Sequence, residues 1–223
     1  MLYIVSTPIG NLKDITLRAL EVLKEADFII VENPRNSLKL LKHYEIPNKP
    51  IFQFAEHNEQ KALETLIPKL KSQNGALITD AGTPGISDPG FRLVRACVNE
   101  GIKVVPIPGA SSVITALAVS GLPTDRFLFI GFIPRTEGKL IKTVELSKST
   151  ESTLIFFDSP HRIKKTAALV AKNHPTAKMV ITRELTKVYE EVVRGSAEAV
   201  MEELVKRKDI KGEITGLISF KNF

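Results

Sequence analysis

The sequence is poor in the residues on which disulfide, redox and metal chemistry depend. It has one cysteine and no tryptophan among 223 residues. A single cysteine excludes an internal disulfide and any CxxC pair for zinc or thiol redox chemistry. The histidines lack the spacing of metal ligands, so we expect no metal site. They stand at His43, His57, His161 and His174.

Long hydrophobic segments are also missing. No apolar run reaches the roughly 18 residues that a membrane-spanning helix needs. The first ten residues, MLYIVSTPIG, have no basic leader before their short apolar stretch, which favours a strand over a signal peptide. We therefore expect a cytoplasmic protein without a membrane segment.

The single cysteine, Cys97, lies in the segment FRLVRACVNEG. Phe91, Val94 and Val98 have the spacing of one apolar stripe on a helix. A small residue beside such a stripe is typical of a protein core. We therefore expect Cys97 to be buried and not to act as a catalytic thiol.

The net charge of +6 is unevenly distributed. Residues 1–125 hold 13 Lys and Arg against 13 Asp and Glu, whereas residues 126–223 hold 18 against 12. A solvated lysine-rich surface is one interpretation of this surplus. The other is a polyanionic substrate that approaches the C-terminal part of the chain.

Apolar runs and helical patterns alternate through the first half of the chain. The runs LYIVS, DFIIVE, PIFQF, GALITD and KVVPI are each followed by a helical pattern. Such near-continuous apolar strands are typical of a parallel sheet covered by helices on both faces. The segment GLPTDRF interrupts the alternation. We therefore predict an N-terminal α/β domain at residues 1–122.

The second part has more strands than helices. Five strand-like runs surround three helical stretches, near residues 139–148, 161–173 and 197–208. This ratio predicts a C-terminal α/β domain at residues 123–223 with a mixed, partly antiparallel sheet.

Three loops at predicted strand ends share glycine, proline and small hydroxyl residues. They are STPIGNL (Ser6–Leu12), DAGTPGISDPG (Asp80–Gly90) and PIPGASS (Pro106–Ser112). In an open α/β sheet, ligands bind outside the carboxyl ends of the strands. Glycine allows close approach of the backbone to a ligand, and proline fixes the turn. None of the loops reads GxGxxG or GxxxxGK[ST], so a dinucleotide site or a P-loop is unsupported.

Two carboxylates in the second loop narrow the class of ligand. Asp80 ends a strand, and Asp88 precedes Pro89, where it either starts the next helix as an N-cap or contacts a ligand. Two carboxylates would repel a phosphate in the absence of a metal. A cationic ligand with hydroxyl groups fits better, and S-adenosylmethionine is such a ligand.

At this point the motifs resemble a known family. TPIGNLKDITLRAL, DAGTPGISDPG, PIPGASS, GLPTDRF, SPHR, RELTK and EEVVRG are similar, in this order, to the ribosomal RNA small subunit methyltransferase I group of the tetrapyrrole methylase superfamily. The resemblance implies a two-domain α/β enzyme, usually a homodimer, with S-adenosylmethionine in a cleft between the domains. It also implies methyl transfer to the ribose 2′-hydroxyl of a cytidine in the decoding region of small-subunit (16S) ribosomal RNA.

The resemblance also implies the residues of the cofactor site. In the first domain these are Pro8, Asp80, Gly82, Thr83, Pro84, Asp88, Ser111 and Ser112. In the second domain they are Phe157, Leu185, Glu213, Ile214 and Thr215.

The sequence departs from the family pattern in two places. The family has EDTR after its second strand, whereas this chain has ENPR, from Glu32 to Arg35. Asn33 thus lacks a carboxylate, and Pro34 lacks a hydroxyl and a backbone donor. The chain ends at Phe223, where many relatives continue into a helical segment.

A ribose hydroxyl becomes a good nucleophile only when it loses its proton, so a general base is expected. The candidates are His57, His161, Glu184 and Glu32, and the sequence does not choose among them. Phosphate contacts dominate affinity for RNA. The candidates for these contacts are Arg35, Arg126, Arg135, Arg162, Arg183, Lys187 and Arg194.

Two alternatives stay open at the level of sequence. One is a methyltransferase of the same superfamily that acts on a corrin or porphyrin precursor, because these polycarboxylates also suit a basic domain. The other is a non-catalytic assembly factor that binds ribosomal RNA and retains the fold.

Overall fold

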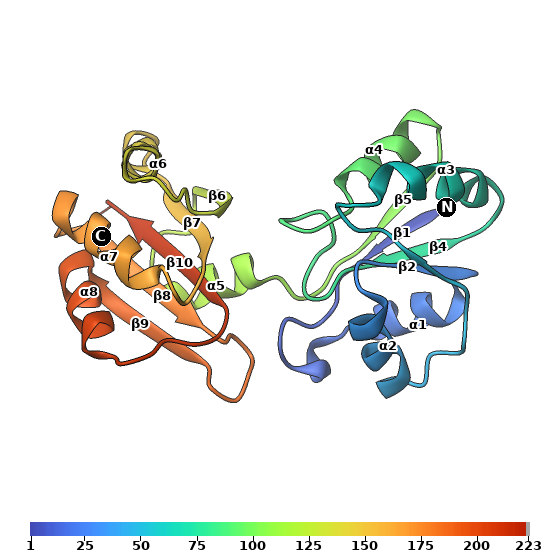
Figure 1. The fold of residues 1–223 in the computed structure, drawn as a ribbon, viewed down its shortest axis with the longest axis horizontal. Helices are drawn as coiled ribbons and strands as arrows, with labels where there is room; N and C mark the ends of the chain where they lie inside the picture. The colour runs from blue at the N-terminus through green and yellow to red at the C-terminus, as the bar shows by residue number, and fades with distance from the viewer. Residues whose placement is uncertain (222–223) are drawn as a thin grey trace. The chain divides into compact units, whose positions relative to one another are not determined.

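The structure is a computed structural model that describes residues 1–221, and its chain divides into two compact units. The first unit is Met1–Ser111, and the second begins at Ser112 (Figure 1). This division falls earlier than the predicted boundary between residues 122 and 123. Helix α5 (Ser112–Ser120) belongs to the second unit because it contacts strands of the second sheet. The two units are described in turn.

The first unit contains a five-stranded parallel sheet. Its strands are β1 (Leu2–Val5), β2 (Phe28–Val31), β3 (Ile51–Gln53), β4 (Gly75–Ile78) and β5 (Val104–Ile107). Their order in the sheet is β3-β2-β4-β1-β5, and every neighbouring pair is parallel. The predicted parallel sheet is confirmed.

Helices cover both faces of this sheet, as predicted (Figure 1). Helices α1 (Leu17–Glu25) and α2 (Pro34–His43) share a core with one face, in which Leu23 and Leu41 are buried. Helices α3 (Glu59–Ser72) and α4 (Phe91–Asn99) cover the other face. A short 3₁₀ helix, η1 (Leu12–Asp14), precedes α1.

Helix α4 buries a different face from the one that its sequence suggested. Leu93 and Cys97 are fully buried, whereas Phe91 and Val98 are each 63% exposed. The expected stripe of Phe91, Val94 and Val98 is therefore wrong in phase, and only Val94 packs against the core. The prediction that Cys97 is a core residue is confirmed, and burial raises the pKa of its thiol to about 11.

The second unit contains a five-stranded mixed sheet. Its strands are β6 (Phe127–Phe132), β7 (Thr153–Asp158), β8 (Lys178–Arg183), β9 (Glu191–Ser196) and β10 (Ile214–Ser219). The order is β6-β7-β10-β8-β9, in which β6 and β7 are parallel and the other pairs are antiparallel. This arrangement confirms the predicted mixed sheet.

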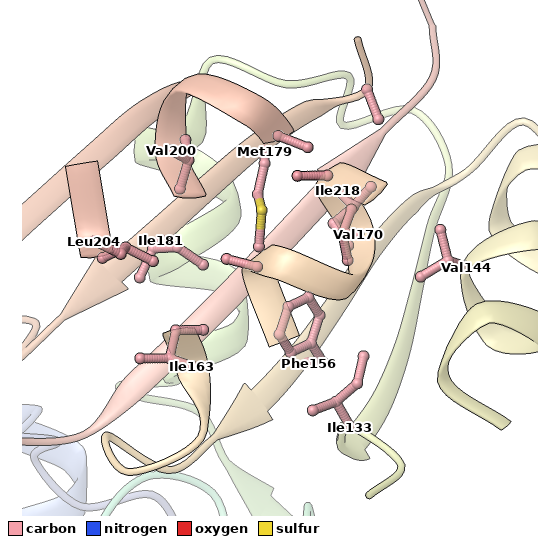
Figure 2. Packing of buried hydrophobic residues seen from close by; sticks show 14 of the residues in the cluster. Ile133, Val144, Phe156, Ile163, Val170, Met179, Ile181, Val200, Leu204 and Ile218 are labelled. Carbon is pink, nitrogen blue, oxygen red and sulfur yellow. The ribbon is translucent and has the colours of Figure 1, made fainter. Parts of the chain in front are cut away.

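Three helices share one core with this second sheet. They are α6 (Glu137–Ser149), α7 (Ile163–Asn173) and α8 (Ala197–Lys206). Figure 2 shows side chains from the strands and helices of this cluster, including Phe156, Met179, Val170 and Leu204, directed into the same space. Across residues 1–221 the structure contains no helix that combines the length and the apolar character needed to cross a membrane.

Gly216 on the central strand β10 offers a test of this packing. A Cβ atom at Gly216 would lie 2.3 Å from Cζ of the buried Phe156. Gly216→Ala should therefore overpack the core and lower the free energy of unfolding of the second unit by about 1–3 kcal/mol. Urea denaturation followed by circular dichroism measures this change.

Gly138→Ala on α6 is the matched control. A Cβ atom there would meet nothing within 4 Å, so this variant should be neutral or slightly stabilising. Equal unfolding midpoints for the two alanine variants would contradict the packing of Phe156 against Gly216.

Candidate functional site

The three Gly- and Pro-containing loops of the first unit meet at one edge of its sheet. They follow β1, β4 and β5, which are neighbours in the order β4-β1-β5. Two backbone hydrogen bonds join the first two loops: Thr7 N donates to Gly82 O at 2.9 Å, and Gly82 N donates to Thr7 O at 3.0 Å. This reciprocal pair is an isolated antiparallel bridge that joins the two loops just beyond the ends of the parallel strands.

Side-chain hydroxyls add further contacts among the three loops. The hydroxyl oxygens of Ser6 and Thr83 lie 2.9 Å apart. The hydroxyl of Thr83 also donates to Ala110 O at 3.4 Å, and that of Thr7 donates to Thr79 O at 3.1 Å. The structure thus brings together the three loops that the sequence analysis singled out.

Two positions in these loops require glycine. A Cβ atom at Gly109 would lie 2.9 Å from Cβ of Ser6, so the close approach of the β1 and β5 loops depends on its absence. Gly82 has φ +80°, a left-handed conformation that side chains other than glycine seldom adopt. Both glycines therefore allow the loops of the cluster to lie close together.

The predicted cofactor residues of the first unit are all in or beside this cluster. Pro8, Gly82 and Pro84 are buried, Asp80 is exposed, and Thr83, Asp88, Ser111 and Ser112 are partly buried. Ser112 is the first residue of α5 and belongs to the second unit. Asp88 is not the N-cap residue of α4, because Gly90 occupies that position.

Carboxylates gather on the other side of β4, at the ends of β2 and β3. Asp80 N donates to Glu32 Oε2 at 3.3 Å, and Asn36 Nδ2 donates to Asp80 Oδ2 at 2.7 Å. The pKa of Glu32 is raised, mainly by burial and further by the negative charges of Asp80 and Glu56, although the Asp80 amide opposes the rise. His57 is exposed in the loop after β3.

Asn36 was missed by the sequence analysis. It is one residue beyond the ENPR segment and lies on the first turn of α2, next to the end of β4. No sequence signal marks it, because its contact with Asp80 depends on β2 and β4 being neighbours in the sheet.

The ENPR segment is the start of helix α2. Asn33 is the N-cap, and its side-chain oxygen accepts a hydrogen bond from Arg35 N at 3.0 Å. Pro34 occupies the first helical position, where a missing amide proton is harmless because that donor has no intrahelical partner. Both departures from the family pattern are thus residues that favour a helix start.

The predicted cofactor residues of the second unit form a group of their own. Phe157 on β7 pairs with Thr215 on β10. Ile214 and Leu185 are buried, and Ile214 belongs to the core. Glu213 is exposed and its carbonyl accepts a hydrogen bond from Glu184 N at 3.0 Å.

The contacts of the Glu184 carboxylate indicate a structural role in the second unit and not a role in proton transfer. Its carboxylate accepts hydrogen bonds from Glu213 N at 2.9 Å and from Lys187 Nζ at 2.9 Å. The hydrogen bond from Glu213 N, followed by that from Lys187, lowers the pKa of Glu184. A carboxylate held in this way is a weaker base than Glu32. His161, the remaining candidate, is exposed in the loop after β7.

Most of the predicted RNA-binding cations have partners within the second unit. Arg183 pairs with Glu191 at 3.0 Å, and Lys187 pairs with Glu184 and Glu213. Arg126 donates to Thr150 O, Arg162 pairs with Asp158, and Arg194 donates to two carbonyls at the end of α5. Arg35 and Arg135 are exposed, and neither forms an ion pair with any of the described residues.

The electrostatics of the three-loop cluster suit a cation better than an anion. Its segments 6–12, 79–90 and 106–112 contain no basic residue, whereas they contain the carboxylates of Asp80 and Asp88. Lys13 follows them in η1. The buried hydroxyl of Thr79, directly before Asp80, has no hydrogen-bond partner among the described residues. Within the described chain, no three His, Cys, Asp or Glu side chains are grouped so that they could hold a metal ion.

Comparison with known proteins identifies the class to which this fold and site belong. A profile of the tetrapyrrole (corrin/porphyrin) methylases matches residues 1–200, and the chain belongs to this family. The predicted resemblance is confirmed, and with it the assignment to the methyltransferases.

Two relatives match almost from end to end. The ribosomal RNA small subunit methyltransferase I of Hydrogenobaculum sp. (strain Y04AAS1) is 45% identical over 99% of this chain and 96% of its own length. The protein of the same name from Thermotoga maritima is 41% identical over 99% of this chain and 98% of its own.

Solved structures support the fold alone. Diphthine synthase matches with a TM-score of 0.76 at 18% identity, over 98% of this chain and 89% of its own. The methyltransferase CobJ matches with a TM-score of 0.69 at 15% identity, over 98% of this chain and 93% of its own.

The role of Asn33 as a helix cap can be tested by stability. Asn33→Ala should lower the free energy of unfolding of the first unit by about 1 kcal/mol, whereas Asn33→Asp should retain the cap. Asn48→Ala, in the exposed loop after α2, is the control and should have no effect. Urea midpoints for the three variants measure this, and an alanine variant as stable as the wild type would exclude the cap.

Proposed function

We propose that the protein transfers a methyl group from S-adenosylmethionine to the ribose 2′-hydroxyl of a cytidine in the decoding region of small-subunit ribosomal RNA. The observation that carries the proposal is the joined three-loop cluster with Asp80 at its side. The relatives named ribosomal RNA small subunit methyltransferase I support the class of acceptor, since they match at 41–50% identity.

The residues present fit the proposed donor. The donor is a sulfonium with an amino acid and a ribose, so it calls for carboxylates, hydroxyls and backbone amides. Asp80, the backbone near Gly82 and Thr83, and the unpartnered Thr79 hydroxyl supply these groups. We propose that they hold it, together with Pro8. The contributions of Asp88, Ser111, Ser112 and the second-unit residues Phe157, Leu185 and 213–215 remain predictions.

S-adenosylmethionine, when bound, supplies a methyl group that is activated for in-line displacement. The protein contributes alignment, which can account for much of the rate. It also contributes a group that accepts the proton of the ribose hydroxyl, and we assign this role to Glu32. Glu32 accepts a hydrogen bond from the Asp80 amide at the edge of the site. Burial raises its pKa, whereas the pKa of the other candidate carboxylate, Glu184, is lowered, so Glu32 is the stronger base of the two.

The alternative acceptor is a corrin or porphyrin precursor. This chain shares its fold with the uroporphyrin III C-methyltransferase of Thermus thermophilus, which matches at 16% identity. Identity at that level supports a common fold and no common substrate. We also propose a homodimer, which sedimentation of the purified protein tests directly.

Titration calorimetry with S-adenosylmethionine tests the donor site, with Asp80→Asn as the variant. The asparagine keeps the backbone amide that contacts Glu32 and a side-chain oxygen for Asn36. It removes only the charge, so the affinity for the donor should fall about tenfold, as expected for loss of a charge-assisted contact. Unchanged affinity in this variant would exclude Asp80 from the donor site.

Methylation of small ribosomal subunits that lack the modification tests the acceptor. Transfer of labelled methyl groups to a single ribose of the subunit RNA is the expected result. Donor binding without transfer to the subunits, but with transfer to a precorrin-type substrate, would overturn the proposed acceptor. RNA binding without donor binding would instead support the non-catalytic alternative.

The assignment of Glu32 predicts a pH profile. Because the pKa of this carboxyl is raised above 4.5, the basic form is lost as the pH falls through the raised value, and kcat/KM should fall with it. Glu32→Gln should remove this limb and lower kcat by about 10²–10⁴. Glu56→Gln is the control, since it should shift the limb to lower pH and retain turnover. An unchanged kcat in Glu32→Gln would eliminate this residue as the base.

A further inference from the structure

Strand β6 contains one residue more than its neighbour β7 between two points of their pairing. Phe129 pairs with Ile155 and Phe132 pairs with Phe157, so three steps on β6 match two steps on β7. Gly131, with φ +66°, lies inside this bulge. A bulge of this kind reverses which side chains face the core. Phe132 is consequently directed away from the core, and Ile133 is buried in it.

Phe132 presents an aromatic ring to solvent at the end of β6. Its side chain is 65% exposed. The ring contacts Phe157 edge to face, at 5.7 Å between centroids, and Phe157 contacts Phe129 in the same way at 5.0 Å. These contacts fix the position of the exposed ring, so that a planar ligand could stack on it without reordering the chain.

The chain from Phe132 to the next cation is also fixed. Arg162 Nη2 donates to Ile133 O at 3.4 Å and to Pro134 O at 3.3 Å. Its guanidinium pairs at 3.5 Å with the buried Asp158. Arg162 therefore braces the segment that precedes Arg135, and Arg135 itself is exposed.

The segment of the chain that contains Arg135 is basic. Residues 126–142 contain Arg126, Arg135, Lys139 and Lys142 against one carboxylate. That carboxylate, Glu137, lies 3.5 Å from Lys172 and is thereby compensated. The chain that follows Phe132 thus carries more positive than negative charge, which favours a polyanion over an uncharged apolar partner.

We propose that Phe132 and Arg135 form a binding site for one nucleotide of single-stranded RNA, with the base stacked on Phe132 and a phosphate beside Arg135. The site rests on the proposed function and deepens it, because it names where the acceptor RNA is held. Aromatic rings that stack on unpaired bases, next to cations for the backbone, are the general means of binding single-stranded RNA. Both residues act in binding and have no role in the chemical step.

The test is equilibrium binding and methylation of small ribosomal subunits that lack the modification. Phe132→Ala should weaken binding about tenfold or more, while Phe132→Tyr should stay within about twofold of the wild type. Arg135→Ala should reduce the slope of log affinity against log salt concentration by about 0.7, the contribution of one phosphate of a single strand. All these variants should keep the wild-type affinity for S-adenosylmethionine.

Val205→Ala and Lys206→Ala, both at exposed positions of α8, are the matched controls and should bind the subunits as the wild type does. An active wild type with an equally active Phe132→Ala variant would overturn the nucleotide site and leave the proposed function intact. A Phe132→Leu variant that binds like Phe132→Tyr would overturn stacking, and a changed sedimentation coefficient for Phe132→Ala would place this ring in a protein contact instead. A wild type that neither binds nor methylates the subunits would overturn the proposed function and this site together.

Discussion

The pair of backbone hydrogen bonds between Thr7 and Gly82 is the constraint on which the candidate site depends. It joins the loops after β1 and β4, and it requires the left-handed conformation of Gly82. The contacts of Ser6 with Thr83 and of Thr83 with Ala110 then follow from the neighbouring positions of the three strands. Loops that are separated by up to a hundred residues in sequence thus form one surface because the sheet order places their strands together.

In the second unit the equivalent constraint is the buried carboxylate of Asp158. It accepts hydrogen bonds from Thr166 at 2.5 Å and from Ser159 N at 2.9 Å, and it holds the guanidinium of Arg162. Since Arg162 in turn binds the carbonyls of Ile133 and Pro134, the ends of β6 and β7 are tied to each other. Arg162, which the sequence analysis named as a candidate for RNA contacts, therefore positions the segment next to the exposed Arg135.

The sequence predicted the two sheets and their helices because apolar periodicity reports burial directly. It predicted the phase of α4 wrongly, since Phe91, Val94 and Val98 have helical spacing that the tertiary packing does not use. The sequence analysis interpreted Asn33 and Pro34 as the loss of a carboxylate, a hydroxyl and a backbone donor. Their position at the start of α2 instead makes them residues that favour a helix start. The partners of Arg183 and Arg194, and the contact of Asn36 with Asp80, depend on strand order, which no local pattern contains.

Asp80 follows β4, and different groups lie on its two sides along the edge of the first sheet. On the β1 side are hydroxyls, glycines and backbone amides, and on the β2 side is Glu32, whose pKa is raised by burial and by the negative charges of Asp80 and Glu56. One of its carboxylate oxygens is held by Asn36, and its amide contacts Glu32. Burial is the main cause of the raised pKa of Glu32, and repulsion from Asp80 adds to it. A cation bound beside Asp80 would reduce this second contribution. Donor binding and the basicity of Glu32 should for this reason be coupled, with the donor-bound enzyme active to lower pH than the free enzyme.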